Sequence, residues 1–328
     1  EDICHRLALD KQSLVLEIAA NDGYLLQYFV ARGIPCYGVE PTASTAAVAR
    51  SRGIEIVSEL FGTKLARSLR RNRRPADLIV ANNVLAHVPD INDFVAGVSM
   101  LLNPHGVATF EFPHLMQLID HTQFDTIYHE HFSYLSLTTV EEIFARSGLS
   151  IFDVEQHPTH GGSLRVFTQA SNSGRRPVSP HVEDLRAVER DRGIETRSYY
   201  QELQANAERI KNDLLEFLIK AKRRNELVAA YGAAAKGNTL LNFAGIRSDL
   251  IAFVADRNPA KQGKFLPGSR IPVYDESALV QQRPRWILVL PWNLEAEIVS
   301  QLAYVKEWGC EFVVATPRLR VVGADTGK

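Results

Sequence analysis

Short apolar runs alternate with amphipathic stretches along the first third of the chain. Each apolar run ends in polar residues, and most runs are followed by apolar residues at helical three- and four-residue spacing. The stretches that each carry a predicted strand are residues 13–33, 35–53, 54–61, 76–90 and 106–113. Strands that alternate with helices over short loops indicate a parallel, doubly wound α/β sheet.

The pattern becomes less regular beyond the fifth predicted strand. Residues 140–148 predict a helix that stops at Gly148. Residues 149–170 predict two strands joined by a turn, which would extend the sheet with antiparallel strands. A polar link at 171–180 leads into a long helical stretch over roughly 181–224 with one apolar stripe.

A second strand–turn–helix unit follows the long helix. The expected organisation is a first α/β domain at 1–170, a linker with a long helix at 171–225, and a smaller Rossmann-like α/β domain at 226–328. The chain length of 328 residues suits such a two-domain arrangement.

Composition narrows the class of protein. With 45% hydrophobic and 23% charged residues the chain can bury a real core, and its net charge of −1 argues against a nucleic-acid partner. No apolar run reaches the ~18 residues of a membrane span. The three cysteines, Cys4, Cys36 and Cys310, lie far apart and form no C-x-x-C pair, so we expect neither a zinc clip nor a disulfide framework, and a reducing, cytoplasmic location.

The first strand runs into a turn that suits a nucleoside-containing cofactor. A strand, a glycine-bearing turn and a helix N-terminus present backbone N–H groups to a ligand. Here the turn runs from Glu17 to Gly23, and Glu40 ends the next strand, where an acid accepts hydrogen bonds from ribose hydroxyls. Two glycine positions of a G-x-G turn are taken by Ala19 and Asn21. The spacing alone fits a dinucleotide and S-adenosylmethionine equally.

The strand at 76–90 distinguishes the two, because NAD sites do not require its polar end, NNVLAHVPD. Together with the acid-first turn and Glu40, this motif resembles the class I S-adenosylmethionine-dependent methyltransferases. That resemblance implies that Glu17 and Gly23 lie at the amino-acid end of the cofactor and Glu40 at its ribose. The full set of expected cofactor-binding residues is Glu17, Ala19, Asn21, Gly23, Tyr24, Glu40, Pro41, Asn82, Asn83 and Leu85.

Eight of the ten histidines lie between residues 87 and 160, and two of them fall in the stretch FDTIYHEHFSYLS (124–136). A helical H-E-x-x-H zinc site is excluded, because Ser133 and Leu135 occupy the required second positions. In a strand, however, His129 and His131 would share a face and could bind a metal with a third ligand.

Acid–base chemistry is the second interpretation of the same stretch. Histidine titrates near neutrality and can remove a proton beside a carbonyl group. Glu130 could fix the imidazole tautomer, while Tyr128 or His87 could donate to a developing enolate oxygen. The third interpretation is a hydrogen-bonded core histidine.

Motifs spread over essentially the whole chain resemble the nucleotide-sugar C-methyltransferases, which act on C3 of dTDP-linked 4-keto deoxysugars in bacterial antibiotic pathways. They are EIAANDGYLLQYF, NNVLAHVPD, FDTIYHEHFSYLS, HGGSLRVF, YGAAAKGNTLLN and DRNPAKQGKFLPG. The resemblance implies that His131 is the general base, that Tyr128 and Glu130 assist it, and that His87 contacts the sugar. The enolate would then attack the sulfonium methyl of S-adenosylmethionine, giving a branched deoxysugar and S-adenosylhomocysteine.

The second α/β unit contains the small-residue turn GAAAKGN (232–238), whose Lys236 could meet a phosphate. Asp256 ends the next strand as in a dinucleotide fold, although G-x-G-x-x-G is absent. The family resemblance instead implies that this domain encloses the nucleotide sugar. The expected substrate-binding residues are His160, Gly161, Gly162, Lys236, Asn238, Lys261 and Lys264, with a plain hairpin turn as the alternative for residues 160–162.

One departure from the family pattern concerns the N-terminus. The family carries a zinc-binding module with clustered cysteines there, of which Cys4-His5 is at most a remnant. We therefore expect a truncated or shortened member without zinc. Three alternatives to a sugar C-methyltransferase stay open: a methyltransferase acting on oxygen or nitrogen of another small molecule, an NAD-dependent nucleotide-sugar oxidoreductase, and a cofactor-binding protein without catalytic activity.

Overall fold

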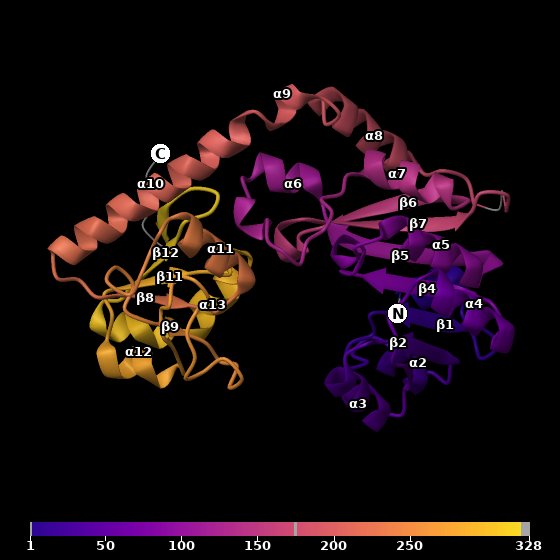
Figure 1. Cartoon of the computed structure of the whole chain (residues 1–328), viewed down its shortest axis with the longest axis horizontal. Coiled ribbons are helices and arrows are strands. Elements are labelled where there is room, and N and C mark those ends of the chain that lie inside the picture. Colours follow the sequence, from indigo (N-terminus) through magenta and orange to yellow (C-terminus); the bar gives the residue numbers. More distant parts are fainter. Residues whose placement is uncertain (1, 174–175, 323–328) are drawn as a thin grey trace. The chain divides into compact units, whose positions relative to one another are not determined.

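The computed structural model describes residues 2–173 and 176–322 and divides the chain into two compact units (Figure 1). The first unit combines Glu1–Met116 with Glu130–Glu195, and the second combines Gln117–His129 with Thr196–Lys328. The expected boundary at residue 170 does not coincide with this division. A short segment from the middle of the chain packs with the second unit, because Phe124 is buried in that unit's hydrophobic core.

The first unit is built on a seven-stranded sheet with the order β3-β2-β1-β4-β5-β7-β6. β1 to β5 are parallel, whereas β7 is antiparallel to both β5 and β6, so the predicted doubly wound sheet with an antiparallel extension is confirmed. Its strands are β1 (Val15–Ile18), β2 (Cys36–Val39), β3 (Glu55–Val57), β4 (Ala76–Asn82), β5 (Leu102–Pro113), β6 (Leu149–His157) and β7 (Ser163–Ala170).

Helices cover the two faces of this sheet. The helices that begin in the first unit are α1 (Asp2–Leu7), α2 (Gln27–Ala31), α3 (Ala43–Ser51), α4 (Thr63–Asn72), α5 (Ile91–Leu101), α6 (Leu115–Asp120), α7 (Leu137–Arg146) and α8 (Pro180–Arg192), with the 3-10 turns η1 (Leu85–His87) and η3 (Thr159–Gly161). On one face α1, α2 and α3 pack on Val15, Leu78 and Val80. On the opposite face the rings of Phe110 and Phe144 pack at a centroid distance of 4.7 Å.

Local signals explain where two helices start and stop. α7 begins three residues earlier than expected, at Leu137, because the hydroxyl of Ser136 accepts a hydrogen bond from the Thr139 amide. The single helix expected over 181–224 is wrong: α8 ends at Gly193, whose left-handed conformation (φ 71°) terminates it. The chain resumes helical structure as α9 (Arg197–Tyr200) and α10 (Glu202–Arg223).

The second unit contains a six-stranded sheet with the order β10-β9-β8-β11-β12-β13, parallel except for β13. Its strands are β8 (Val228–Tyr231), β9 (Val254–Ala255), β10 (Val273–Tyr274), β11 (Trp286–Val289), β12 (Glu311–Val314) and β13 (Arg320–Val322). Its remaining helices are α11 (Ala235–Phe243), α12 (Ser277–Gln282) and α13 (Glu295–Gln301), with the 3-10 turns η2 (Phe124–Thr126), η4 (Trp292–Leu294) and η5 (Ala303–Trp308).

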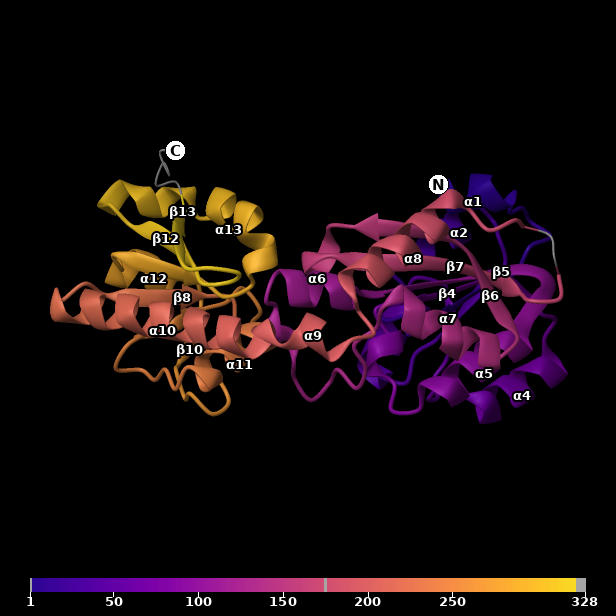
Figure 2. The ribbon, with the colours of Figure 1, turned by 90° about the horizontal axis from the view of Figure 1, so that it is seen from above.

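Helices lie on both faces of this sheet, which gives the unit three layers (Figure 2), and a separate apolar cluster fills the space on each face. α10 and α11 pack on one face of the sheet through residues such as Leu214 and Leu241. α12, α13 and η5 pack on the other face through Leu279, Ile298 and Val305. The expected second, smaller Rossmann-like domain is therefore present. Within residues 2–173 and 176–322, none of the helices has the length and apolar character that crossing a bilayer requires.

Candidate active site

The turn after β1 is shaped by left-handed backbone positions. Ala19 (φ 59°) and Asn21 (φ 49°) adopt conformations usually left to glycine, so the chain makes the turn of a G-x-G motif without its glycines. Gly23 (φ 77°) is tightly packed, because an added Cβ would lie 2.3 Å from Ile54 Cδ1 and 3.1 Å from Ala49 Cβ. The turn is therefore strained and tightly packed, as functional turns commonly are.

Glu40, the acid that follows β2, fastens this turn to the second strand. Its Oε2 accepts a hydrogen bond from the Asn21 amide at 3.0 Å, and its Oε1 accepts one from the Thr42 amide at 2.8 Å. The side chain is 6% exposed. A carboxylate held in this way at the carboxyl ends of β1 and β2 is placed where ribose hydroxyls bind in doubly wound folds.

A mostly apolar cavity of about 350 Å³ opens at the carboxyl ends of β1 to β4. Three residues expected from the sequence line it: Ala19, Pro41 and His87. Leu85 does not, because its side chain is fully buried in the core. The other lining residues are Ile18, Val39, Leu60, Phe61, Val84, Val88, Pro89, Asp90, Asp93 and Phe94.

Sequence reasoning missed the contribution of the segment after β3. Leu60 and Phe61 line the cavity, and Phe61 is supported by an edge-on contact of its ring with Phe94 at 5.3 Å. The available signal was the apolar pair in SELFG (58–62), which follows the third strand at the same edge of the sheet as the cofactor turn. An apolar cavity bordered by an acid suits a purine nucleoside.

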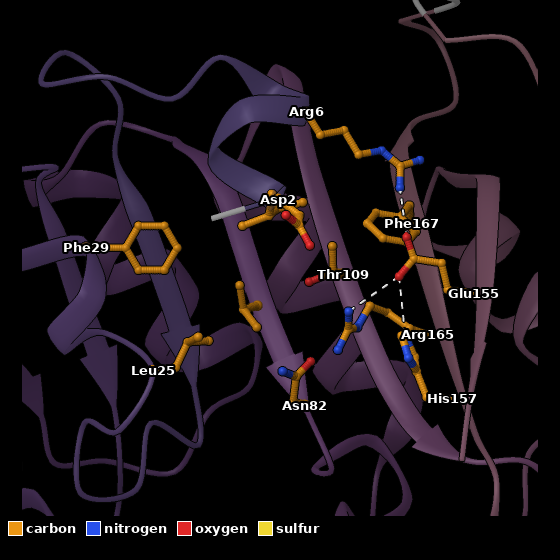
Figure 3. Close-up of a pocket in the computed structure, with 12 residues that line it drawn as sticks. Asp2, Arg6, Leu25, Phe29, Asn82, Thr109, Glu155, His157, Arg165 and Phe167 are labelled. Carbon is orange, nitrogen blue, oxygen red and sulfur yellow. Dashed lines mark hydrogen bonds and ion pairs between the residues drawn. The ribbon is translucent and has the colours of Figure 1, made fainter. Parts of the chain in front are cut away.

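A second cavity of about 250 Å³ lies beside Asn82, beneath α1 (Figure 3). Glu155 stands on its wall and pairs with three cationic or titratable side chains: Arg6 at 3.2 Å, His157 at 3.2 Å and Arg165 at 3.4 Å. The remaining lining residues are Asp2, Ile3, Leu25, Phe29, Val80, Thr109 and Phe167. Tyr24, expected to bind cofactor, lines neither cavity and is 65% exposed.

Two buried acceptors near the end of β1 and β4 have no hydrogen-bond partner: Glu17 Oε2 and Asn82 Oδ1. Burial, and then the charge of Asp22, raise the pKa of Glu17 to about 8. Unpartnered buried acceptors are costly unless a ligand supplies the donor. An ammonium group has three donors and a positive charge, so it fits this pair well. Asn83 next to them adopts a left-handed conformation (φ 53°) and its amide donates to the Glu111 carbonyl at 2.7 Å.

The structure brings His131 and His87 together in the first unit. Their ring centroids lie 4.8 Å apart with the planes at 77°. The contact is enforced by the backbone, since the amide of Phe132 donates to the Ala86 carbonyl at 2.8 Å. The ring of Tyr134 lies 6.2 Å from that of His131. Because His87 also lines the apolar cavity, His131 contacts a residue of the expected cofactor site.

The other residues of the histidine stretch divide between the two units. Tyr128 and His129 pack with the second unit, whereas Glu130 packs with the first. His160 (φ 56°), Gly161 and Gly162 form the turn between β6 and β7, so the hairpin alternative for these residues describes their local structure.

The lysines expected at the substrate belong to the second unit: Lys236 lies in the first turn of α11, and Lys261 and Lys264 lie on the loop after β9. Lys236 Nζ donates to Asn293 Oδ1 at 2.7 Å and lies 4.5 Å from the centre of the Trp292 ring. Lys261 Nζ donates to the Ala233 carbonyl at 2.9 Å and to Asp256 Oδ2 at 3.2 Å.

Lys261 therefore links the turn after β8 to the end of β9. Asp256, the acid that would bind a ribose in a dinucleotide fold, already accepts hydrogen bonds from Lys261 and from the Ala233 amide. Asn238 lies in α11, where the side-chain amide of Asn242 donates to its carbonyl at 2.9 Å, and Lys264 is exposed on the loop after β9. Among the residues that the structure describes, no three His, Cys, Asp or Glu side chains cluster as a metal site requires.

Comparisons with known proteins identify the family of the chain. The family described as a methyltransferase domain matches residues 1–154, and the family described as a C-methyltransferase C-terminal domain matches residues 158–317. The C-methyltransferase NovU of Streptomyces niveus is 36% identical over 326 residues, which is 99% of this chain and 77% of that protein.

Solved structures of methyltransferases resemble part of the chain. A Haloferax volcanii complex of the Trm112 methyltransferase activator with a methyltransferase matches at a TM-score of 0.41 and 15% identity, over 51% of this chain and 88% of that one. The magnesium protoporphyrin IX methyltransferase of Synechocystis with bound S-adenosylmethionine matches at a TM-score of 0.38 and 13% identity, over 51% and 76% of the two chains.

Proposed function

The chain belongs to the C-methyltransferase family and is an S-adenosylmethionine-dependent methyltransferase, and from this premise we propose that it methylates C3 of a nucleotide-linked 4-keto deoxysugar with His131 as the general base. The observation that carries the proposal is the contact of the His131 and His87 rings beside the apolar cavity at the carboxyl ends of β1 to β4. The general base and the methyl group of the cofactor must both reach C3 of the sugar. The position of His131 beside His87, which lines the cavity, supports this requirement.

The cofactor fits the residues around that cavity. We assign its adenine to the apolar wall that includes Phe61 and Val84, its ribose to Glu40, and its α-ammonium to the unpartnered oxygens of Glu17 and Asn82. When bound, S-adenosylmethionine supplies the electrophilic methyl group.

His131 removes the proton from C3, and the adjacent keto group makes this proton acidic enough only if the enolate oxygen is stabilised. One well-placed donor is worth about 3–4 kcal/mol in such a site. We assign donation to the enolate oxygen or its neighbours to Tyr128 and His87, and orientation of the imidazole to Glu130. Lys236, Asn238 and Lys264 of the second unit, with the hairpin residues His160, Gly161 and Gly162, are proposed to bind the nucleotide sugar. Lys261 is proposed to act there through the turn that it fastens.

Exchange of the C3 hydrogen tests the base directly. A dTDP-linked 4-keto deoxysugar in heavy water, without S-adenosylmethionine, should lose its C3 proton signal in NMR spectra when the protein is added. We expect His131→Ala to slow this exchange by at least about 100-fold, because general-base catalysis contributes roughly 100- to 10,000-fold. S-Adenosylhomocysteine affinity should stay within threefold, since the cofactor residues are untouched.

His129→Ala is the matched control, because it removes an imidazole from the same stretch only two positions away. Exchange should persist in this control. Undiminished exchange in His131→Ala, or equal loss in both variants, would remove His131 from the role of base. If oxygen or nitrogen is methylated instead, the wild-type protein exchanges no carbon-bound hydrogen at all.

A further inference from the structure

The segment that contains the first half of the histidine stretch packs with the second unit. Residues Gln117–His129 pack with that unit, although the chain before and after them belongs to the first. At the centre of the segment, Phe124 is buried among core residues of α10, α11 and β11, and its ring lies 5.0 Å from that of Phe243. The start of the stretch that carries His131 is thus held by a packed hydrophobic anchor.

A buried carboxylate sits next to this anchor. Asp125 has no exposed surface, and its Oδ2 accepts a hydrogen bond from the indole N–H of Trp292 at 2.7 Å. Its Oδ1 has no hydrogen-bond partner. Burial raises the pKa of Asp125 to about 6, while the Trp292 hydrogen bond and the charge of Lys236 act in the opposite direction. We call Asp125, Trp292, Lys236 and Asn293 the Asp125 cluster.

The Asp125 cluster lies at the centre of the second sheet's carboxyl edge. Lys236 follows β8 and Trp292 follows β11, the two neighbouring strands from which the chain order runs outward in opposite directions. Helix α11, which begins at this edge, is the element that packs most closely on η2. The anchor is therefore built at the junction of β8 and β11, which pair with each other along their whole length.

The burial of the Asp125 carboxyl group is energetically unfavourable. Removing a carboxyl group from water costs free energy that an apolar side chain would not cost, so its benefit must lie in direction and specificity. The hydrogen bond to Trp292 fixes one residue of the segment in one register. Consecutive Cα atoms lie about 3.8 Å apart, so a slip by one residue would put each side chain of the stretch near its neighbour's place and move His131 by more than the ~2.6–3.2 Å length of a hydrogen bond.

The other end of the histidine stretch is fixed within the first unit. Leu135 bridges to His114, and its carbonyl accepts a hydrogen bond from the Leu115 amide at 2.9 Å. His114 is itself buried and its Nε2 lies 2.8 Å from Oε1 of the buried Glu189. Each end of the stretch therefore lies next to a buried polar residue. Asp125 holds its first part, and His114 lies beside its last part.

We propose that Asp125 is a positioning residue: its hydrogen bond to Trp292 sets the register of the stretch from Tyr128 to His131 and so places the base. The proposal rests on the proposed function for the role of His131, but the anchoring itself is independent of it. Asp125 touches no reacting atom in this assignment. It acts through the backbone of the short segment that joins it to His131.

Three substitutions test the hydrogen bond rather than the charge. Asp125→Asn keeps an oxygen acceptor for the indole N–H, Asp125→Leu removes it while keeping the same branching of the side chain, and Trp292→Phe removes the donor while keeping an aromatic ring. For C3-hydrogen exchange with the dTDP-linked 4-keto deoxysugar, we expect Asp125→Leu and Trp292→Phe to lower kcat by at least 10-fold. KM and S-adenosylhomocysteine affinity should stay within threefold, and Asp125→Asn should remain within threefold of wild type.

Amide hydrogen exchange gives a readout that does not depend on activity. Backbone amides of residues 127–134 should exchange at least 10-fold faster in Asp125→Leu, while those of α11 stay protected and show that the unit is folded. Should that variant fail to fold, Trp292→Phe decides by the same two measurements. Wild-type kcat and wild-type protection in the decisive variant would overturn the proposal. A wild-type protein that exchanges no C3 hydrogen would reject the proposed function, and the amide measurement would still judge the anchor.

Discussion

At the scale of one residue, Glu17 is a buried carboxyl group of the candidate site with one oxygen that has no hydrogen-bond partner. Its Oε2 accepts no hydrogen bond, and burial holds the pKa of the carboxyl near 8, so the group keeps its proton at neutral pH. The unfolded chain would release that proton near the ordinary value of 4.5. The folded protein therefore binds a proton that the unfolded chain does not, and its stability falls as pH rises from about 5 to about 8.

Glu17→Gln is expected to separate stability from cofactor affinity. The amide introduced by this substitution has no proton to lose, so the unliganded variant should melt at a higher temperature than wild type at pH 8, and this difference should shrink toward pH 5. S-Adenosylhomocysteine should bind roughly 10- to 100-fold more weakly, because a charge-assisted hydrogen bond worth about 1.5–3 kcal/mol is lost.

The wild-type affinity should also rise with pH up to about 8, as Glu17 gives up its proton to face the ammonium group. Calorimetric titrations of both proteins between pH 6 and 8.5 would measure this slope, which should vanish in the variant. A wild-type affinity that does not change with pH would contradict the assignment of Glu17 to the ammonium group.

At the scale of elements, the turn between β1 and α2 is held by close packing against α3. Gly23 and Gly53 have the same backbone angle (φ 77°), but only Gly23 faces neighbours: an added Cβ would lie 2.3 Å from Ile54 Cδ1 and 3.1 Å from Ala49 Cβ. At Gly53 an added Cβ would meet nothing within 4 Å. Alanine substitutions at these two glycines therefore separate the free-energy cost of backbone strain from the cost of overpacking.

Gly53→Ala should cost about 1–2 kcal/mol of stability, the strain of a left-handed alanine, and leave cofactor affinity unchanged. Gly23→Ala carries the same strain and should lose a further ~1–3 kcal/mol to overpacking. Because the displaced turn carries Ala19 and Asn21, S-adenosylhomocysteine affinity should fall at least 10-fold. Urea unfolding and calorimetry measure both quantities, and equal behaviour of the two variants would show that packing against α3 is unimportant.

Elements with strong periodic patterns could be predicted from the sequence, and weak or long-range ones could not. The order of strands and helices in the first sheet follows from apolar runs such as that at 76–90. β10 and β13 were missed because two or three residues carry no periodicity. The break between α8 and α10 was also missed, although Gly193 is a stop signal of the same kind as Gly148, which was recognised.

In the candidate site, too, residues carried by a local motif could be predicted, whereas contacts between distant parts of the chain could not. Local motifs predicted Glu17, Glu40 and the histidine stretch. The partners of Asp125 could not be inferred, since Trp292 lies 167 positions away and nothing in either local sequence connects them. Tyr24 was placed by its position in the turn, but the turn directs its side chain to solvent. The residues of a motif can thus be predicted from the sequence, but the contacts that hold them in place become known only from the fold.

At the scale of the whole molecule, each unit has hydrophobic clusters of its own. The cores of the second unit centre on residues such as Leu214 and Phe312, and those of the first on residues such as Leu78 and Val107. Chains with separate cores commonly unfold in more than one step. The three tryptophans, Trp286, Trp292 and Trp308, all belong to the second unit, so their fluorescence reports on that unit alone.

Ligands should therefore act on the two units separately. S-Adenosylhomocysteine at 100 times its Kd stabilises the unit that binds it by about 2.7 kcal/mol. For units of this size 1 kcal/mol shifts the Tm by roughly 2–4 °C, so the transition of the first unit should rise by about 5–10 °C in circular dichroism. The tryptophan fluorescence transition should not move, because the expected cofactor residues lie outside the second unit.

Thymidine diphosphate should do the opposite, since Lys236, Asn238 and Lys264 belong to the second unit. It should raise the fluorescence transition, and Lys236→Met should abolish that rise while leaving the response to S-adenosylhomocysteine intact. NAD should shift neither transition, because Asp256 already accepts hydrogen bonds from the Ala233 amide and Lys261. A fluorescence transition that rises with NAD instead would favour the oxidoreductase alternative for the second unit, and one that rises with S-adenosylhomocysteine would show that the cofactor's binding energy is not confined to the first.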